Sequence, residues 1–561
     1  MIRLPQTPFA PTPRGAAAIT PLEVLLLALA TLAGLALRGW HLDLAGLTHF
    51  DEGVYAFSGL GVADASQPAR LFPEQQKFSP PVYFTLVALF NLLGATPERS
   101  PFVVNLVMGT VSIPVLWVLT RRWFGPVAAM AAAWWLAGSE FHVAMSRTAL
   151  TDVTFALTFV IALGAVIAAI DRGSRASAVL AGVCVGLAWN TKYHGWFALV
   201  VGAMVIAARW QMQGAGLSWL RERIRIWLVM SVVAFVCYLP WTLFIQTQPG
   251  SSSGWVSYFA TMLRLDWFGN LWRQVEQQAY LEGAWSRASV PLGAVAAWLV
   301  ARRTGRDLAW WFVPALAIAA MIVGSAGTAL LLAIVGLGMA WRRGMTLPAW
   351  LLASVLALWF VMAPVYHPYF RLILPFTIAT FALGGAAVED HAVPVRAASP
   401  WRGLLVGAVA VLAAGAVGVW RADPSDPWRS TTGLVAAADR LSADVPAGEP
   451  VSVIGEPALA FYLQRRGHPS WQRTTIEGLD SLTAPRYVVT GIYARRAPML
   501  VTRLQERRDH LELLDRVPIS PPSDLRLLDD FKPDSARRWL AVPDSTYDLL
   551  LYRYTPPAVR R

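Results

Sequence analysis

The sequence predicts a polytopic α-helical membrane protein that ends in a soluble α/β domain. Hydrophobic residues make up 56% of the 561 residues and charged residues only 15%. The apolar residues gather in runs of about 20 residues or slightly fewer, which is the length that an α-helix needs to cross a bilayer. Near residue 422 the composition changes to charged and proline-rich sequence, which indicates a separate domain over residues 422–561.

About thirteen apolar runs in residues 1–421 are candidate membrane spans. They lie near residues 22–39, 100–120, 124–141, 150–170, 177–191, 195–209, 226–244, 287–302, 308–323, 326–341, 348–365, 371–387 and 403–420. No small-residue cleavage site follows Pro21–Trp40, so we expect a retained span and not a removed signal peptide.

Arginines indicate which side of the membrane each loop faces. If the N-terminus is cytoplasmic, every predicted inside loop is basic, with Arg121, Arg122, Arg172, Arg175, Arg209, Arg221, Arg223, Arg225, Arg302, Arg303, Arg306, Arg342, Arg343, Arg396 and Arg402. This distribution follows the positive-inside rule, so the net charge of +12 is read as a topology signal and not as a nucleic-acid surface. An odd number of spans places the C-terminal domain outside.

Two long outer loops, residues 40–99 and 245–286, separate some of the spans. In the first, the apolar stretch Pro80–Leu93 is too short to cross a bilayer and predicts a helix that lies in the interface. The second is rich in aromatic residues such as Trp267 and Trp272, which anchor at the level of the headgroups. It could serve as a lid or as a plain interfacial loop.

The C-terminal domain is predicted to contain short buried strands and two helices. The strands are Val451–Gly455, Arg486–Gly491 and Leu549–Tyr554, and the helices are Pro457–Arg466 and Ala497–Arg508. A single glycine after the first strand is no dinucleotide fingerprint, so no cofactor is expected. The two cysteines, Cys184 and Cys237, lie in apolar runs and predict neither a disulfide nor a thiolate metal site.

The predicted topology places most of the unusual polar residues on the outer side. They are Asp51, Glu52, Lys77, Arg147, Asp152, Lys192, His194, His367, Tyr369 and Arg371. Ionisable groups at membrane depth are costly and usually mark function or pair with one another. We therefore expect one site at the outer interface.

Asp51 and Asp152 each allow two interpretations. A carboxylate at the position of Asp51 can act as a general base, or the pair Asp51-Glu52 can stabilise a helix N-terminus. Asp152 can cap the span that it begins, or it can pair with Arg147 and form the wall of a polar site.

Three basic residues, Lys77, Lys192 and Arg371, suit a phosphate or diphosphate, although attraction to anionic headgroups is the alternative. His194 and His367 lack a diagnostic metal-ligand spacing, so no metal is predicted.

An ordered series of motifs carries a family resemblance. It comprises Phe50-Asp51-Glu52-Gly53-Val54-Tyr55, Pro80-Pro81-Val82-Tyr83-Phe84, Arg147 followed by Asp152, and Gly186-Leu187-Ala188-Trp189-Asn190-Thr191-Lys192. The series covers residues 20–210 and resembles the GT-C membrane glycosyltransferases, especially family 39, with the protein O-mannosyltransferases and the lipid A aminoarabinose transferase.

The resemblance implies transfer of a sugar from a polyprenyl-phosphate donor to a hydroxyl or amine of a lipid, glycan or protein, with inversion. Asp51 would be the base, Glu52 would orient it or the sugar, and Lys77, Lys192 and Arg371 would neutralise the leaving phosphate. The pocket would include Tyr55, Arg147, Asp152, Tyr193, His194, His367 and Tyr369. Residues 1–421 would be the transferase domain of a bacterial inner-membrane protein whose site faces outward.

The sequence departs from the family pattern at three points. Ser79 stands where a histidine often precedes Pro80-Pro81, the third acidic position of the metal-using relatives is not evident, and the C-terminal domain lacks β-trefoil character. A transporter or flippase is the alternative function, although its polar residues should lie near the midplane in paired repeats. A membrane-anchored scaffold is a third possibility.

Overall fold

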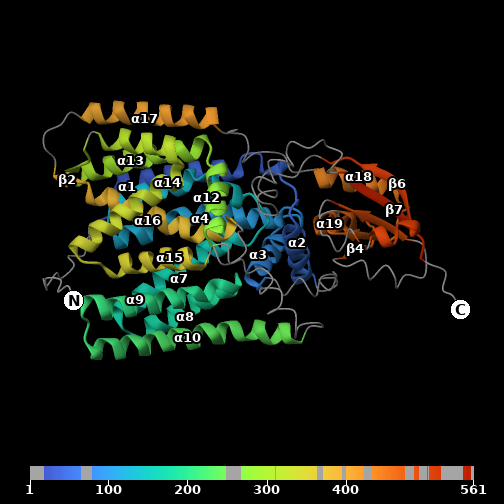
Figure 1. Cartoon of the computed structure of the whole chain (residues 1–561), viewed down its shortest axis with the longest axis horizontal. Helices are drawn as coiled ribbons and strands as arrows, with labels where there is room; N and C mark the ends of the chain where they lie inside the picture. The colour runs from blue at the N-terminus through green and yellow to red at the C-terminus, as the bar shows by residue number, and fades with distance from the viewer. Residues whose placement is uncertain are drawn as a thin grey trace.

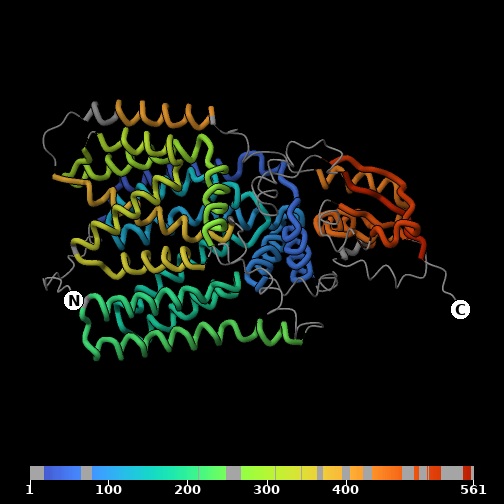
Figure 2. The backbone as a smooth tube through the Cα atoms, in the orientation of Figure 1, coloured from blue at the N-terminus to red at the C-terminus, as the bar shows by residue number. Residues whose placement is uncertain are grey.

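The computed structural model describes the greater part of the chain. The described residues are 18–64, 79–247, 267–309, 311–362, 370–394, 400–421, 433–473, 486–491, 502, 504–519 and 548–556. They form three parts along the long axis of the molecule (Figures 1 and 2). A bundle of long helices is followed by a layer of short helices and then by the C-terminal α/β domain.

The bundle is built from roughly parallel long helices that coincide with the predicted apolar runs (Figure 1), and from the short helix α6, which lies mostly beyond the predicted run 124–141. Its helices are α1 (Pro21–Gly39), α4 (Ser100–Trp123), α5 (Pro126–Gly138), α6 (Glu140–Ser146), α7 (Asp152–Arg172), α8 (Arg175–Trp189), α9 (Phe197–Gln213), α10 (Leu217–Gln246), α13 (Ala284–Arg303), α14 (Phe312–Arg343), α15 (Leu347–Met362), α16 (Leu374–Asp390) and α17 (Pro400–Arg421). Short 3₁₀ turns, η4 (Tyr193–Trp196) and η5 (Phe370–Ile373), lead into α9 and α16. In the described part of the chain, seven helices are long and apolar enough to span a membrane.

A break at Ser139 divides one predicted span into α5 and α6. The break leaves backbone carbonyls at the end of α5 without helical partners. The fully buried Arg38 donates to the carbonyls of Leu136 and Ala137, each at 3.1 Å, and to Nδ1 of His142 at 2.9 Å. Arg38 thereby joins the end of α1 to the break.

Gly324 interrupts α14, where the sequence predicts two separate apolar runs between residues 308 and 341. Its φ of +73° lies in the left-handed region that favours glycine. The carboxylate of Glu282 accepts a hydrogen bond from the N–H of Ala326 at 2.6 Å, so it caps the segment that follows the break. The prediction of two helical runs is therefore correct, and the break lies between them.

Three short helices lie at the end of the bundle that faces the α/β domain (Figure 1). Two of them stand between the bundle and this domain, and the third crosses the ends of the bundle helices. They are α2 (Phe50–Ala63), α3 (Val82–Leu92) and α12 (Trp267–Leu281). The predicted helix in the stretch Pro80–Leu93 is confirmed as α3. The sequence did not predict α12, and it predicted α2 only through one interpretation of Asp51-Glu52, as residues at a helix N-terminus. In α12 the aromatic side chains of Phe268 and Trp272 are 80% and 69% exposed, while the amides of Gln274 and Gln277 are buried.

The C-terminal domain contains one five-stranded sheet with the order β4-β3-β5-β7-β6. Its elements are α18 (Gly433–Asp444), β3 (Val451–Ile454), α19 (Pro457–Arg465), β4 (Ser470–Arg473), β5 (Arg486–Thr490), β6 (Leu511–Val517) and β7 (Leu549–Tyr554). Strand β3 is parallel to β4 and β5, and β7 is antiparallel to β5 and β6. The three predicted strands and the first predicted helix are confirmed. The predicted helix 497–508 lies largely outside the described residues.

Candidate active site

Asp51 lies in the first turn of α2, and hydrogen bonds around His49 fix where this helix begins. Nδ1 of His49 accepts from the N–H of Asp51 at 3.0 Å. The carboxylate of Glu52 returns to the N–H of His49 at 2.8 Å, which completes a capping box. The interpretation of Asp51-Glu52 as residues at a helix N-terminus is therefore correct, and it leaves the side chain of Asp51 available for another partner.

Asp51 is the first member of a chain of four alternating charges. Nη2 of Arg371, in η5, lies 2.9 Å from Oδ2 of Asp51. Nη1 of the same guanidinium lies 3.6 Å from Oδ2 of Asp152, the first residue of α7. The ammonium of Lys192, in the turn after α8, pairs with Oδ1 of Asp152. Four separate segments of the chain thus bring four predicted site residues together.

Asp51 is the most exposed member of this chain of charges, and Asp152 is the most buried. The side chain of Asp152 is 2% exposed, those of Arg371 and Lys192 are 10% and 16% exposed, and that of Asp51 is 29% exposed. Two carboxylates balance two cations, which lowers the cost of holding ionised groups at this depth. Among the described residues, Oδ1 of Asp51 has no hydrogen-bond partner. Asp51 is therefore the accessible end of an otherwise buried network.

Both carboxylate oxygens of Glu52 accept hydrogen bonds from backbone N–H groups. Oε2 accepts from the N–H groups of Thr48 and His49 at 2.7 and 2.8 Å, and Oε1 accepts from the N–H of Ala149 at 2.8 Å. The side chain is 3% exposed. Glu52 thus ties α2 to the segment that precedes α7, next to Asp51.

Asn105 is a site-supporting residue that the sequence analysis missed. Its side-chain amide, fully buried in α4, donates to the carbonyls of Thr148 and Leu150, both at 2.6 Å. The same side chain accepts from the hydroxyl of Thr154 at 3.2 Å. These bonds fix the loop that leads into Asp152. Asn105 is a polar residue inside an apolar run, and a buried amide needs hydrogen-bond partners. This is the sequence signal that could have identified it.

Arg147 does not form the predicted pair with Asp152. Its guanidinium instead donates to the carbonyls of Arg38 and Trp40, at 3.0 and 2.5 Å. These carbonyls lie at the C-terminal end of α1, where helical partners are missing and a positive charge is favoured. The hypothesis of an Arg147–Asp152 wall is therefore wrong, because the carbonyls at the end of α1 take up Arg147, whereas Asp152 pairs with Lys192 and Arg371.

Tyr55 lies one turn after Asp51 on the same face of α2. Its ring packs against Tyr83 and Phe84 with centroids 5.8 and 5.7 Å apart. Burial, together with the nearby carboxylate of Asp51, raises the pKa of Tyr55 well above its usual value. Tyr55 therefore stays neutral beside the charged network.

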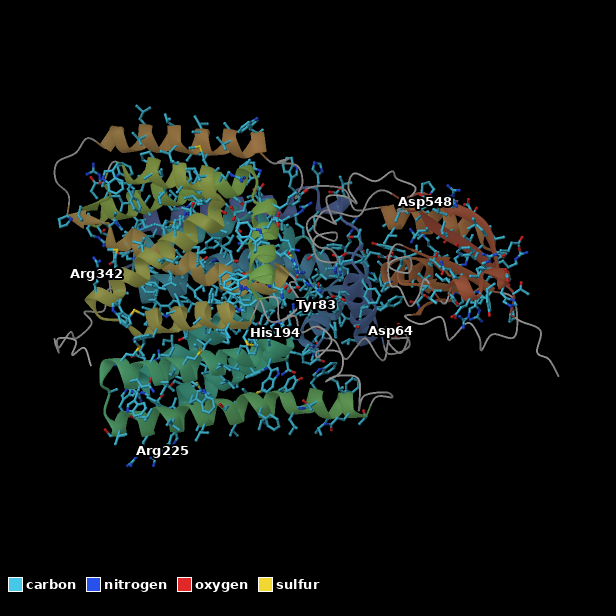
Figure 3. The ribbon with its side chains drawn as sticks, in the orientation of Figure 1. Asp64, Tyr83, His194, Arg225, Arg342 and Asp548 are labelled. Carbon is cyan, nitrogen blue, oxygen red and sulfur yellow. The ribbon has the colours of Figure 1, made fainter. Side chains whose placement is uncertain are left out.

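The remaining predicted residues divide into two groups. The ring of His194 packs edge-to-face on Phe155 at 5.0 Å, and the hydroxyl of Tyr193 accepts from Trp241 at 3.4 Å, so both side chains are engaged in helix packing. Figure 3 shows His194 and Tyr83 where the bundle meets the layer of short helices. The other group lies outside the described residues and comprises Lys77, His367 and Tyr369.

Chemically, the arrangement combines one accessible carboxylate with two fixed cations. Asp51 can accept a proton, whereas Arg371 and Lys192 can stabilise negative charge beside it. Within the described ranges, no three His, Cys, Asp or Glu side chains converge to hold a metal ion.

Comparisons with known proteins show a similarity to the family that the motifs suggested. The family model described as dolichyl-phosphate-mannose-protein mannosyltransferase matches residues 79–244. No protein in a search of curated sequences matches significantly. The resemblance to GT-C membrane glycosyltransferases is confirmed.

Solved structures show the fold. AglB, an oligosaccharyltransferase of Archaeoglobus fulgidus in complex with an inhibitory peptide and a dolichol-phosphate, has a TM-score of 0.52 at 13% identity. The likeness covers 85% of this chain and 70% of that one. ArnT of Cupriavidus metallidurans bound to undecaprenyl phosphate gives a TM-score of 0.47 at 17% identity over 96% of this chain and 98% of that one. The likeness to AglB shows that this chain has the GT-C fold.

Proposed function

We propose that the chain is a glycosyltransferase that moves a sugar from a polyprenyl-phosphate donor to a hydroxyl or amine acceptor, with Asp51 as general base. The acceptor is a lipid, glycan or protein outside the cytoplasm. The single observation that carries the proposal is the network Asp51–Arg371–Asp152–Lys192, which offers a base and two cations within one array. The family model and the dolichol-phosphate complex of a protein with the same fold support a lipid-phosphate donor.

The proposed reaction is one inverting displacement. Asp51 takes the proton of the acceptor hydroxyl or amine while the acceptor oxygen or nitrogen bonds to the anomeric carbon. The bond between that carbon and the phosphate oxygen breaks, and its electron pair leaves with the polyprenyl phosphate. Arg371 and Lys192 stabilise the negative charge that builds on this phosphate. Glu52 and Asn105 hold the backbone that carries Asp51 and Asp152, and Lys77 is a further candidate for the phosphate.

We further propose thirteen membrane crossings, with the site and the α/β domain on the extracytoplasmic side of a bacterial inner membrane. The helices α5 and α6 count together as one crossing, and the two parts of α14 count separately. Arg225 and Arg342 lie toward the end of the bundle remote from the α/β domain (Figure 3), which is the side on which the positive-inside rule requires arginines.

A transfer assay tests the proposed function. Purified full-length protein in liposomes is incubated with radiolabelled sugars on undecaprenyl phosphate and with extracts of outer-envelope lipids, glycans and proteins. We expect labelled product and released undecaprenyl phosphate with the wild type. Asp51→Asn should keep donor binding but lose about 10²- to 10⁴-fold in rate, the usual contribution of a general base. Movement of intact donor across the bilayer without release of undecaprenyl phosphate would instead identify a flippase.

A further inference from the structure

The α/β domain packs against the helix that carries Asp51. Residues two positions apart on an α-helix point in nearly opposite directions, because each residue turns the helix by about 100°. Asp51 faces Arg371 in the bundle, and Gly53 faces α19 of the C-terminal domain. A Cβ atom on Gly53 would overlap the backbone of Pro457 and Ala458. Only glycine therefore allows this approach of α2 and α19 (Figure 1).

Further contacts extend this interface along α2. The ring of Phe57, one turn after Gly53, packs edge-to-face on Phe461 with centroids 5.2 Å apart. Before the helix, the N–H of Leu47 donates to the hydroxyl of Tyr462 at 2.7 Å. All these side chains are buried, so the contacts are shielded from water. They hold α2 at its beginning and along its first two turns.

Helix α19 contacts α2 at an edge of the β-sheet that in other proteins usually binds ligands. The helix follows β3, and its first turn lies at the carboxyl end of the parallel strands β3 and β5. In open α/β domains this edge is the usual ligand site. Here the first turn of α19 is covered by Gly53 of α2. The domain therefore uses this edge to hold another part of the same chain.

We infer that α19 is a positioning element for Asp51, with Gly53 and Tyr462 as positioning residues. This inference rests on the proposed role of Asp51 as base. Asp51 belongs to α2, but its partners Arg371 and Asp152 belong to the bundle, so the 2.9 Å contact depends on how α2 is seated. The bundle holds one side of α2 and α19 holds the other. A displacement of about 1 Å in a reacting group can cost about 10²-fold in rate.

Two substitutions in the full-length protein test the inference. Gly53→Ala introduces the Cβ that overlaps α19, and Tyr462→Phe removes only the hydroxyl that accepts from Leu47. Gly39→Ala is the matched glycine control, because its Cβ would meet no atom nearer than Leu106 at 3.8 Å. Arg465→Gln is the control for the interface periphery, since the pair of Arg465 with Glu98 is exposed.

Two readouts are needed. With labelled sugar on undecaprenyl phosphate as the probe, we expect kcat to fall about 100-fold for Gly53→Ala and about tenfold for Tyr462→Phe, with the donor KM unchanged. Without any donor, hydrogen–deuterium exchange of residues 45–60 should increase in both variants and in neither control. If the wild type shows no transfer, only the proposed function is refuted. The exchange measurement can still test whether α19 positions α2.

Two results would overturn the inference. The first is a kcat within about twofold of the wild type in both variants with unchanged exchange. The second is a parallel loss of kcat, donor binding and thermal stability, which would mean that α19 serves folding and not the placement of Asp51.

Discussion

Nη2 of Arg371 lies 2.9 Å from Oδ2 of Asp51, although 320 residues separate them in sequence. The same guanidinium also faces Asp152, so Arg371 links the carboxylate on the short helix α2 to the one that begins α7. A planar guanidinium with two outward amino groups suits this double role. The arrangement fixes one oxygen of Asp51 and leaves the other accessible.

Arg371→Lys should reduce transfer although it keeps the charge. An ammonium is a single point charge and cannot reach both carboxylates with a rigid fork. Loss of one charge-assisted hydrogen bond is worth about 1.5–3 kcal/mol, so we expect kcat/KM to fall about 10- to 100-fold. Arg440→Lys, at the exposed pair with Asp515, is the matched control and should have little effect. Equal activity of Arg371→Lys and wild type would show that the bridge is dispensable.

The sequence was most informative where a feature depends on local composition. The apolar runs predicted the bundle helices because hydrophobic length is a property of a single segment. Asp51 stood out because an acidic pair follows the first span. Arg371 was predicted as a phosphate ligand and Arg147 as the partner of Asp152, but no local pattern could show that Arg371, and not Arg147, would pair with Asp152 and Asp51.

Each error has its own physical cause. Arg147 was expected in the site because ionisable residues at membrane depth suggest function, yet carbonyls at the end of α1 satisfy it equally well. Only the beginning of α2 was considered, as one interpretation of Asp51-Glu52, because the helix is buried on both sides and shows no clear amphipathic stripe. Helix α12 was missed because its aromatic residues were interpreted as headgroup anchors of a loop, although exposed aromatic residues and buried amides alternate in it with a helical period.

The buried pair Lys192–Asp152 should contribute to stability as a unit. Lys192→Met leaves Asp152 with only the more distant Arg371, and Asp152→Asn leaves a cation without its nearest carboxylate. Removal of one partner of a buried pair costs about 3–5 kcal/mol. We expect each single variant to lower the thermal unfolding temperature in detergent, and the double variant to lose less than the sum.

The control for this cycle is the exposed pair Arg465–Glu98, where a cycle of Arg465→Gln and Glu98→Gln should show coupling of less than about 1 kcal/mol. Additive losses at Lys192 and Asp152 would contradict the direct pairing in the network.

Glu52→Gln should show whether Glu52 positions α2 or takes part in the chemical step. A glutamine cannot accept from all three N–H groups that Glu52 binds, because one of its ends carries an NH₂ group. We expect a loss of about 1.5–3 kcal/mol in stability and a rate reduced about tenfold. The pH profile of the remaining activity should keep its shape, because Asp51 is still the base. A protein with normal stability and no turnover would assign Glu52 to the chemical step.

Stability should depend on pH through Glu282. Burial raises the pKa of this carboxyl group from 4.5 to about 7. The folded state therefore holds a proton that the unfolded chain releases, and stability falls as pH rises from about 4.5 to about 7. Glu282→Gln removes this titration but keeps an acceptor for the N–H of Ala326. The unfolding temperature in detergent, measured from about pH 5 to about pH 8, should decline less in the variant than in the wild type. Parallel pH profiles of the two proteins would show that Glu282 titrates normally.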